Sequence, residues 1–559
     1  MDDLMKDDDK EKKPGNGKND RGKDRGRRKG RQISPYLRFL YTLLGLLCAA
    51  LVIAIAAQEY YFSHTYRKGE LALENAAKPR SGHRFMKEEE EPQPAKAGES
   101  AGEEETESVS GTGAAPASAK EEKTDQGSGS IHLETTESVS LKKQLMGIMP
   151  GIGTPGRTAE QLMEDAARMA AMYDYEGAAE LIKSCDGFAE DSGMQEKAAE
   201  YKELQETLVE YPADKVPHVF FHSLIKDPKK AFDGDQYEDG YNQYMVTIRE
   251  FNSIIEQMYE NGWVLVSLED VAAATSEDGR SGFKAGHIML PKDKKPFVLS
   301  EDDVCYYHYM DGDGFPSKLI VDENGDIRNE YIEDDGSVTV GDFDMIPLID
   351  RFLEEHPDFS YHGAKGYIAL TGYDGILGYR TDICYKTRQN LDTYQTEFFE
   401  QHPEFDEAAW EKEREDAKKV AQAIIDDGWV FASHTWGHQG MGEDRTTWEQ
   451  FVSDVDKWDE RVAPLIGGTN VLIYAFGGDI AGTADYEGRR FEYLKKKGFD
   501  YFCGVDSAAY WVQIRDDYVR QMRRNIDGYR MYYNPEMLED LFDVKEAWDP
   551  ERPASVPPI

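Results

Sequence analysis

The chain contains 559 residues, more than one hydrophobic core usually supports, so at least two structural units are expected. Its formal net charge of −43 argues against a nucleic-acid-binding protein, because recognition of phosphates requires a basic surface. Hydrophobic residues make up 40% of the chain, enough for a sizeable globular core, and five cysteines in this length exclude a disulfide-framework protein.

The N-terminal region combines a basic stretch with an apolar one. Residues 1–38 carry 13 Lys and Arg against 8 Asp and Glu, and residues 39–57 are 19 consecutive residues without a charge. A helix of that length spans about 28 Å, close to the hydrocarbon thickness of a bilayer. The positive-inside rule then predicts a single-pass protein of the cell membrane, with a cytoplasmic tail at 1–38, a transmembrane helix at 39–57 in the lipid bilayer, and residues 58–559 outside. The alternative is a cleaved signal peptide, whose apolar region is usually shorter.

Residues 58–211 are expected to separate the membrane from the main domain. Residues 87–130 contain no Leu, Ile, Met or aromatic side chain, so residues 58–155 are predicted to be a disordered linker. Residues 156–211 show apolar side chains at helical spacing, which predicts a helical hairpin. The hairpin resembles one tetratricopeptide-like repeat, but stable arrays need about three, so a spacer that packs on the next domain is favoured.

From residue 212 onward, strand-like and helix-like runs alternate. This alternation continues for about 300 residues and predicts either a parallel sheet or a (β/α) barrel in a domain spanning 212–535, followed by a C-terminal tail at 536–559. A hairpin-rich insertion is expected between Asp311 and Phe343. Within it, residues 322–326 have the look of a Ca²⁺ loop, but a hairpin turn is favoured because the later glutamate is missing. The main strand-like runs are 216–224, 263–271, 296–303, 363–372, 429–438, 470–478 and 499–505.

Two of these runs end in groups that bind metals or move protons. An apolar strand runs into Glu301, Asp302 and Asp303, although a solvated loop or a helix cap is the alternative for such an acidic triplet. A second apolar strand runs into His434 and His438, whose spacing lets both imidazoles reach one ion. One aspartate and two histidines with an open position are typical of a catalytic metal site.

These motifs resemble those of the polysaccharide deacetylases, the family-four carbohydrate esterases, over roughly residues 216–530. The family's first motif, two aspartates after an apolar strand, is matched by Asp302 and Asp303, and its second, His-Ser/Thr-x-x-His, by residues 434–438. The resemblance implies a distorted (β/α) barrel of the polysaccharide deacetylase type. It also implies that Asp302 is the base and that Asp303, His434 and His438 hold one divalent ion, with zinc first and cobalt, nickel or manganese as alternatives.

The function implied is that of a membrane-anchored extracellular hydrolase. It would remove N-acetyl groups from an N-acetylated glycan of the cell surface, such as peptidoglycan or a poly-N-acetylglucosamine-like polymer, and release acetate. Arg524, or its neighbour Arg523, would steady the base. Residues 474–478 resemble the family's third motif, so Tyr474 and Phe476, together with Trp436, are expected to contact the sugar, whereas most aromatic side chains are core.

The chain departs from the family pattern at three points. Glu301 precedes the aspartates, the third motif lacks its proline, and no histidine follows His438 to act as the general acid. His222 or His308 would have to supply that acid, or water would protonate the leaving amine. The alternative functions are a catalytically degenerate glycan-binding module on the same fold and an unrelated membrane-anchored interaction protein.

Overall fold

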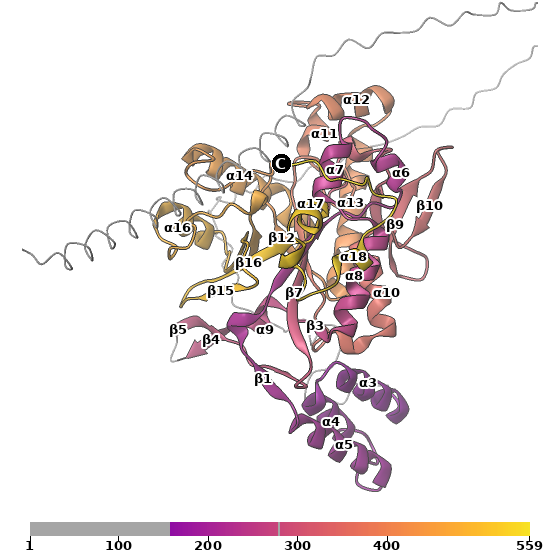
Figure 1. Ribbon diagram of the computed structural model, residues 1–559, viewed down its shortest axis with the longest axis vertical. Coiled ribbons are helices and arrows are strands. Elements are labelled where there is room, and N and C mark those ends of the chain that lie inside the picture. The colour runs from indigo at the N-terminus through magenta and orange to yellow at the C-terminus, as the bar shows by residue number, and fades with distance from the viewer. Residues whose placement is uncertain (1–156, 278–279) are drawn as a thin grey trace, which may run out of the picture. The chain divides into compact units, whose positions relative to one another are not determined.

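The computed structural model describes residues 157–277 and 280–559 (Figure 1). The segments predicted to be the cytoplasmic tail, the transmembrane helix and the disordered linker, residues 1–155, lie outside these residues. Within the described ranges, no helix combines the length and the apolar character needed to cross a membrane.

Seven parallel strands of the described chain close into a barrel. The order is β7–β11–β12–β13–β14–β16–β2, and β2 pairs again with β7. Strand β11 is buried along its whole length and β7 along all but its first residue, as expected for parallel strands covered on both faces. The alternation of elements therefore predicted the α/β class correctly, and of the two architectures it allowed, a parallel sheet or a (β/α) barrel, the structure shows the barrel. The bounds are β2 (His218–His222), β7 (Lys295–Asp302), β11 (Tyr367–Leu370), β12 (Val430–Ser433), β13 (Val471–Ile473), β14 (Tyr501–Val505) and β16 (Val519–Asn525).

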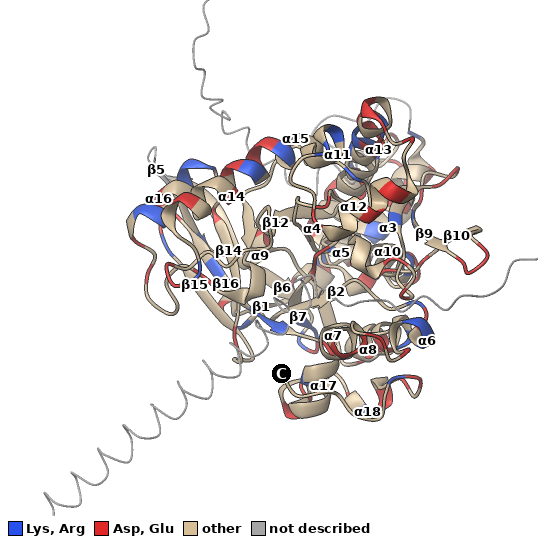
Figure 2. Ribbon diagram, turned by 90° about the horizontal axis from the view of Figure 1, so that it is seen from above, with Lys and Arg blue, Asp and Glu red and all other residues tan. Residues whose placement is uncertain are grey.

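Amphipathic helices cover the barrel. Helix α8 (Ile248–Glu260) begins at a capping box formed by Thr247 and Glu250, and its buried face includes Phe251, whose ring lies 5.0 Å from that of Phe221 on β2. Acidic and basic residues are interleaved along the outer surfaces of α13 and α14 (Figure 2). The other helices of four or more residues around the barrel are α6 (Pro228–Ala231), α7 (Glu238–Tyr244), α9 (Leu268–Val271), α10 (Met345–Glu355), α11 (Ile383–Thr387), α12 (Thr393–Gln401), α13 (Glu407–Asp426), α14 (Trp448–Arg461), α15 (Ala463–Ile466), α16 (Gly488–Lys496), α17 (Gly528–Tyr533) and α18 (Val544–Ala547).

The predicted insertion is a three-stranded antiparallel sheet. Strands β8 (Lys318–Val321), β9 (Ile327–Ile332) and β10 (Val338–Gly341) pair in sequence order. The segment 322–326 is the turn between β8 and β9, in which the Asp322 carboxylate accepts the N–H groups of Asn324 and Asp326, so the hairpin interpretation is confirmed. The remaining strands are β1 (Val209–Tyr211), β3 (Trp263–Leu265), β4 (Ala272–Glu277), β5 (Arg280–Ala285), β6 (Ile288–Leu290) and β15 (Trp511–Ile514).

The segment before the barrel contains three described helices, where the sequence predicted a hairpin of two. The first run is split into α3 (Ala159–Ala171) and α4 (Tyr175–Lys183), and α5 (Ser192–Gln205) follows. The break occurs because Tyr173 has a φ of 67° and Asp174 then caps α4 by accepting the N–H of Gly177. The hydroxyl of Tyr173 also donates to the carbonyl of Asp358, which attaches the helices to the barrel domain.

The segment 536–559, predicted to be a tail, is part of the barrel domain. Leu538 and Phe542 are buried in the largest apolar cluster. The Arg552 guanidinium donates to both carboxylate oxygens of Glu250 at the start of α8, at 2.9 and 2.6 Å, and to the carbonyls of Asn242 and Met245. Both side chains of this ion pair are 0% exposed, so the C-terminal segment is attached by a fully desolvated charge pair.

Replacement of Arg552 by Ala is expected to lower the free energy of unfolding by about 3–5 kcal/mol, because Glu250 would remain buried without its partner. Urea unfolding followed by circular dichroism measures the change. The matched control is Arg515→Ala, which removes an ion pair to Asp485 between two exposed side chains and should leave stability almost unchanged. An equal decrease in the free energy of unfolding in the two variants would contradict the prediction that the buried ion pair matters more than the exposed one.

Candidate metal centre

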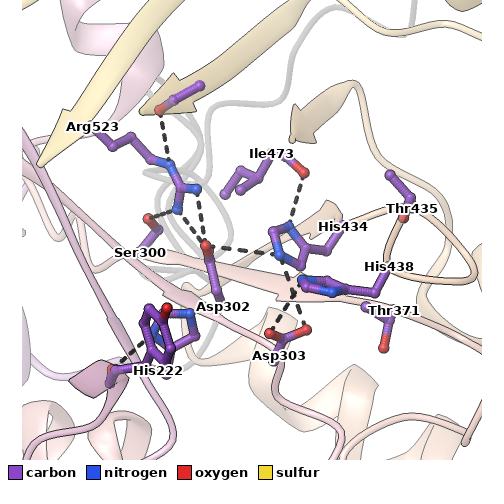
Figure 3. A network of polar contacts seen from close by, with 12 residues as sticks. His222, Ser300, Asp302, Asp303, Thr371, His434, Thr435, His438, Ile473 and Arg523 are labelled. Atoms are coloured by element: carbon purple, nitrogen blue, oxygen red, sulfur yellow. Dashed lines mark hydrogen bonds and ion pairs between the residues drawn. The ribbon is translucent and has the colours of Figure 1, made fainter. Parts of the chain in front are cut away.

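Three potential metal ligands converge at the C-terminal ends of two barrel strands. Asp303 follows β7, and His434 and His438 follow β12 (Figure 3). One ligand atom from each residue lies within 4.8 Å of the other two. The three residues therefore form a group that could hold an ion, as the spacing in the sequence predicted. Because all strands of the barrel are parallel, their ends share one rim, which is where chemistry gathers in barrels of this kind.

Unusual backbone conformations bring the three side chains together. Asp303 has a φ of 63°, Thr435 of 66° and His438 of 49°. A non-glycine residue in this region costs about 1–3 kcal/mol and persists only where the surrounding structure holds it. Here the support includes Asp454 of α14, whose carboxylate accepts the N–H groups of Trp436 and Gly437 at 2.8 Å each. The loop between the two histidines is therefore fixed from outside the barrel.

The two histidines present their ring nitrogens in a form suited to metal binding. His434 Nδ1 lies 2.9 Å from the carbonyl of Ile473, which fixes the ring so that Nε2 faces the carboxylates. His434 Nε2 is 4.0 Å from Asp303 Oδ1, and His438 Nε2 is 3.6 Å from Asp303 Oδ2. Burial lowers the pKa of His438 to about 4, so its imidazole is neutral at pH 7. The donor set thus fits a divalent ion of the zinc type.

The second aspartate, Asp302, lies beside this group but is held differently. Arg523 on β16 donates to both of its carboxylate oxygens, at 2.6 and 2.9 Å, and also to Ser300 at 3.1 Å. Burial alone would raise the pKa of Asp302, but the charges of Arg523 and His434 hold it well below its usual range. Asp302 is therefore an ionised carboxylate whose Oδ2 is 3.8 Å from His434 Nε2.

The structure corrects the prediction for Arg524. Its guanidinium donates to Asp540, at 2.8 and 3.0 Å, and to the carbonyl of Met537 rather than to Asp302. Successive side chains of a strand point to opposite faces, and on β16 it is Arg523 that points into the barrel. The role predicted for Arg524 belongs by position to its neighbour.

The three aromatic residues expected to contact sugar differ in position. Tyr474 is 0% exposed, and its hydroxyl accepts a hydrogen bond from Tyr486 at 3.0 Å, so it is a core residue and the prediction for it is wrong. Trp436 is partly buried, with Nε1 donating to Asp382 at 3.0 Å. Phe476 is partly buried, and its ring centroid lies 4.3 Å from that of the ligand His438.

Of the two histidines considered as the general acid, His222 lies at the site. It ends β2, and in the register of β2 with β7 it is opposite Asp302 (Figure 3). Its Nδ1 is 3.1 Å from the carbonyl of Tyr244, and its charge contributes to lowering the pKa of both Asp302 and Asp303. His308 instead pairs with Asp311 at 2.8 Å and packs against Phe398.

The sequence interpretation missed the residues that support the ligands. Asp454 and Ile473 are distant in the chain from the histidines they fix, and no local pattern marks them. Tyr307 donates to Asp303 at 2.7 Å and follows its partner by only four residues, but nothing in the spacing marks its hydroxyl as a partner of the carboxylate. Comparisons of the chain with protein-family models, curated proteins and solved structures found no match.

The full-length protein is expected to bind one equivalent of Zn²⁺ or Co²⁺, and His438→Ala should abolish this binding. Because the pKa of His438 is about 4, protons compete with the metal for this ligand only as the pH falls towards that value. Isothermal titration at pH 7 measures the stoichiometry. The control is His402→Ala, which alters an exposed histidine paired with Glu404. Tight binding that survives His438→Ala would show that the ion lies elsewhere.

Proposed function

We propose that this protein is a metal-dependent hydrolase that removes N-acetyl groups from a polysaccharide, as the resemblance to polysaccharide deacetylases implies. The observation that carries the proposal is that two carboxylates with different partners lie side by side at one rim of the barrel. Asp303 lies with His434 and His438, whereas Asp302 is ionised, bound by Arg523 and within 4 Å of the same imidazole. A site that only binds an ion has no need of the second carboxylate.

The ion would be held by Asp303, His434 and His438, with zinc expected first and cobalt, nickel or manganese as alternatives. When bound, it supplies polarisation of the acetamide carbonyl and a lowered pKa for a water molecule. Asp302 accepts the proton of the attacking water, because it is ionised and its two oxygens are oriented by Arg523. Arg523 is fully buried, so it keeps Asp302 in place throughout the reaction.

His222 is the proposed general acid. It would take the role of the family's later histidine, since no histidine follows His438 in this chain. Nδ1 of His222 lies 3.1 Å from the carbonyl of Tyr244, which leaves Nε2 as the nitrogen that would donate, and the residue is opposite Asp302 in the register of the two strands. In its protonated form, Nε2–H can donate to the amine that leaves when the amide bond breaks. The base and the acid would thus come from two adjacent strands, β7 and β2, and act on the same substrate.

The substrate proposed is an N-acetylated glycan of the cell surface, peptidoglycan or a poly-N-acetylglucosamine-like polymer. Residues 39–57, predicted to anchor the chain in the lipid bilayer, support a substrate outside the membrane, because the deacetylase domain follows them in the chain. The products are acetate and a free amino group on the sugar.

Acetate release from N-acetylglucosamine oligomers tests the proposal. The full-length protein with added Zn²⁺ or Co²⁺ should release acetate, and Asp302→Asn should reduce the rate by about 10²–10⁴-fold, because the base is lost. Arg524→Lys serves as the control, since Arg524 bonds to Asp540 away from the site. Binding of metal and oligomer without any acetate release would support the glycan-binding module instead.

The effect on the rate of removing the proposed acid should depend on the leaving group of the substrate. His222→Asn is expected to slow release of acetate from the sugar amide by about 10²–10⁴-fold but to change hydrolysis of p-nitrophenyl acetate little, because nitrophenolate leaves without a proton. The ratio of the two rates is measured for the parent and for His222→Asn. His308→Asn should leave this ratio unchanged; a change of the ratio in that variant alone would assign the acid to His308.

A further inference from the structure

A buried tyrosine hydroxyl donates to the carboxylate of Asp303, the one carboxylate among the three proposed ligands. Tyr307 is 4% exposed, and its Oη lies 2.7 Å from Asp303 Oδ1. The other oxygen of the same carboxylate, Oδ2, is 3.6 Å from His438 Nε2. The carboxylate is therefore oriented by a group that is not one of the three proposed ligands.

The position of the Tyr307 hydroxyl is itself fixed from two sides. Its ring lies between those of Tyr309 and Tyr373, with centroids 5.4 and 5.2 Å away and interplanar angles of 17° and 14°. Its Oη is also 2.7 Å from Oγ1 of Thr371, the residue that follows β11, and Thr371 is fully buried. Stacking and hydrogen bonding thus leave the hydroxyl little freedom to move away from Asp303.

Asp303 needs such support because its backbone does not hold the side chain in place. The residue lies just beyond the end of β7, with a φ of 63°, outside the ladder of strand hydrogen bonds. A carboxylate in this position can rotate about its side-chain torsions, and every orientation lost on metal binding weakens the affinity. A partner that selects the binding orientation beforehand removes that cost.

We propose that Tyr307 is a positioning residue, whose hydroxyl, fixed by Thr371 and by the two flanking rings, holds the Asp303 carboxylate in its ligating orientation and thereby sets the affinity of the site for metal. The inference rests on the part of the proposed function that makes Asp303 a ligand. It does not depend on the reaction that the bound metal supports.

The test compares Tyr307→Phe with Tyr309→Phe in the full-length protein. Both variants keep an aromatic ring in the stack, but the first alone removes the hydroxyl bonded to Asp303. Competition with a chromophoric chelator should show that Tyr307→Phe binds Zn²⁺ about 10–100-fold more weakly than the parent, with Tyr309→Phe unchanged. The visible absorption of the Co²⁺-loaded protein should change in Tyr307→Phe, because it reports the geometry of the ligands.

Parental zinc affinity in a folded Tyr307→Phe protein would overturn the inference. If that variant does not fold, Thr371→Val decides, since it removes the second partner of the Tyr307 hydroxyl; weaker zinc binding supports the inference and unchanged binding overturns it. The outcome is separable from that for the deacetylase. Weaker zinc binding in Tyr307→Phe, with no acetate released by the parent, would support the positioning role and refute the proposed reaction.

Discussion

The site depends on the way strand β7 closes the barrel. This strand pairs with β2 on one side and β11 on the other, and both pairings are parallel. Closure therefore brings the C-terminal ends of three strands together around Asp302 and Asp303. His222 comes from β2, Thr371 follows β11, and His434 and His438 follow β12, the next strand around the ring. The position of each polar group is therefore set by the pairing of the buried, largely apolar strand that precedes it.

The sequence was sufficient for the parts of this arrangement that depend on local pattern. Alternating strand-like and helix-like runs predicted a parallel sheet or a (β/α) barrel, and the acidic and histidine residues at strand ends predicted a group of one aspartate and two histidines. The resemblance to the deacetylases singled out the barrel and Asp303. Both predictions follow from one fact, that parallel strands end on a common rim. The deacetylase function, in contrast, stays a proposal, because it was inferred from the likeness of two short motifs.

The predictions that failed required knowledge of register or burial, which local pattern does not contain. Arg523 and Arg524 are adjacent, and the register of β16 alone decides which one faces the barrel interior. Tyr474 and Phe476 are two residues apart, yet one is core and the other lies by His438, because the chain has left β13 at Ile473 and turns at Phe476, whose φ is 57°. The tail predicted for residues 536–559 is wrong for the same reason. The segment is attached through Arg552 and Glu250, and a contact between residues about 300 positions apart leaves no local pattern in the sequence.

The left-handed backbone conformation at Asp303 constrains the length of the chain between the two aspartates. In a continuing strand, Asp302 and Asp303 would point to opposite faces, one into the barrel and one away from it. The turn at Asp303 cancels that alternation, so both carboxylates lie within 4 Å of the same His434 nitrogen. The relative position of the two carboxylates thus depends on Asp302 and Asp303 being adjacent in the chain. A residue inserted between them would separate the two carboxylates and would also displace Val304 and Tyr306, which follow in the chain and are buried in the core, so the length of this junction is constrained from both sides.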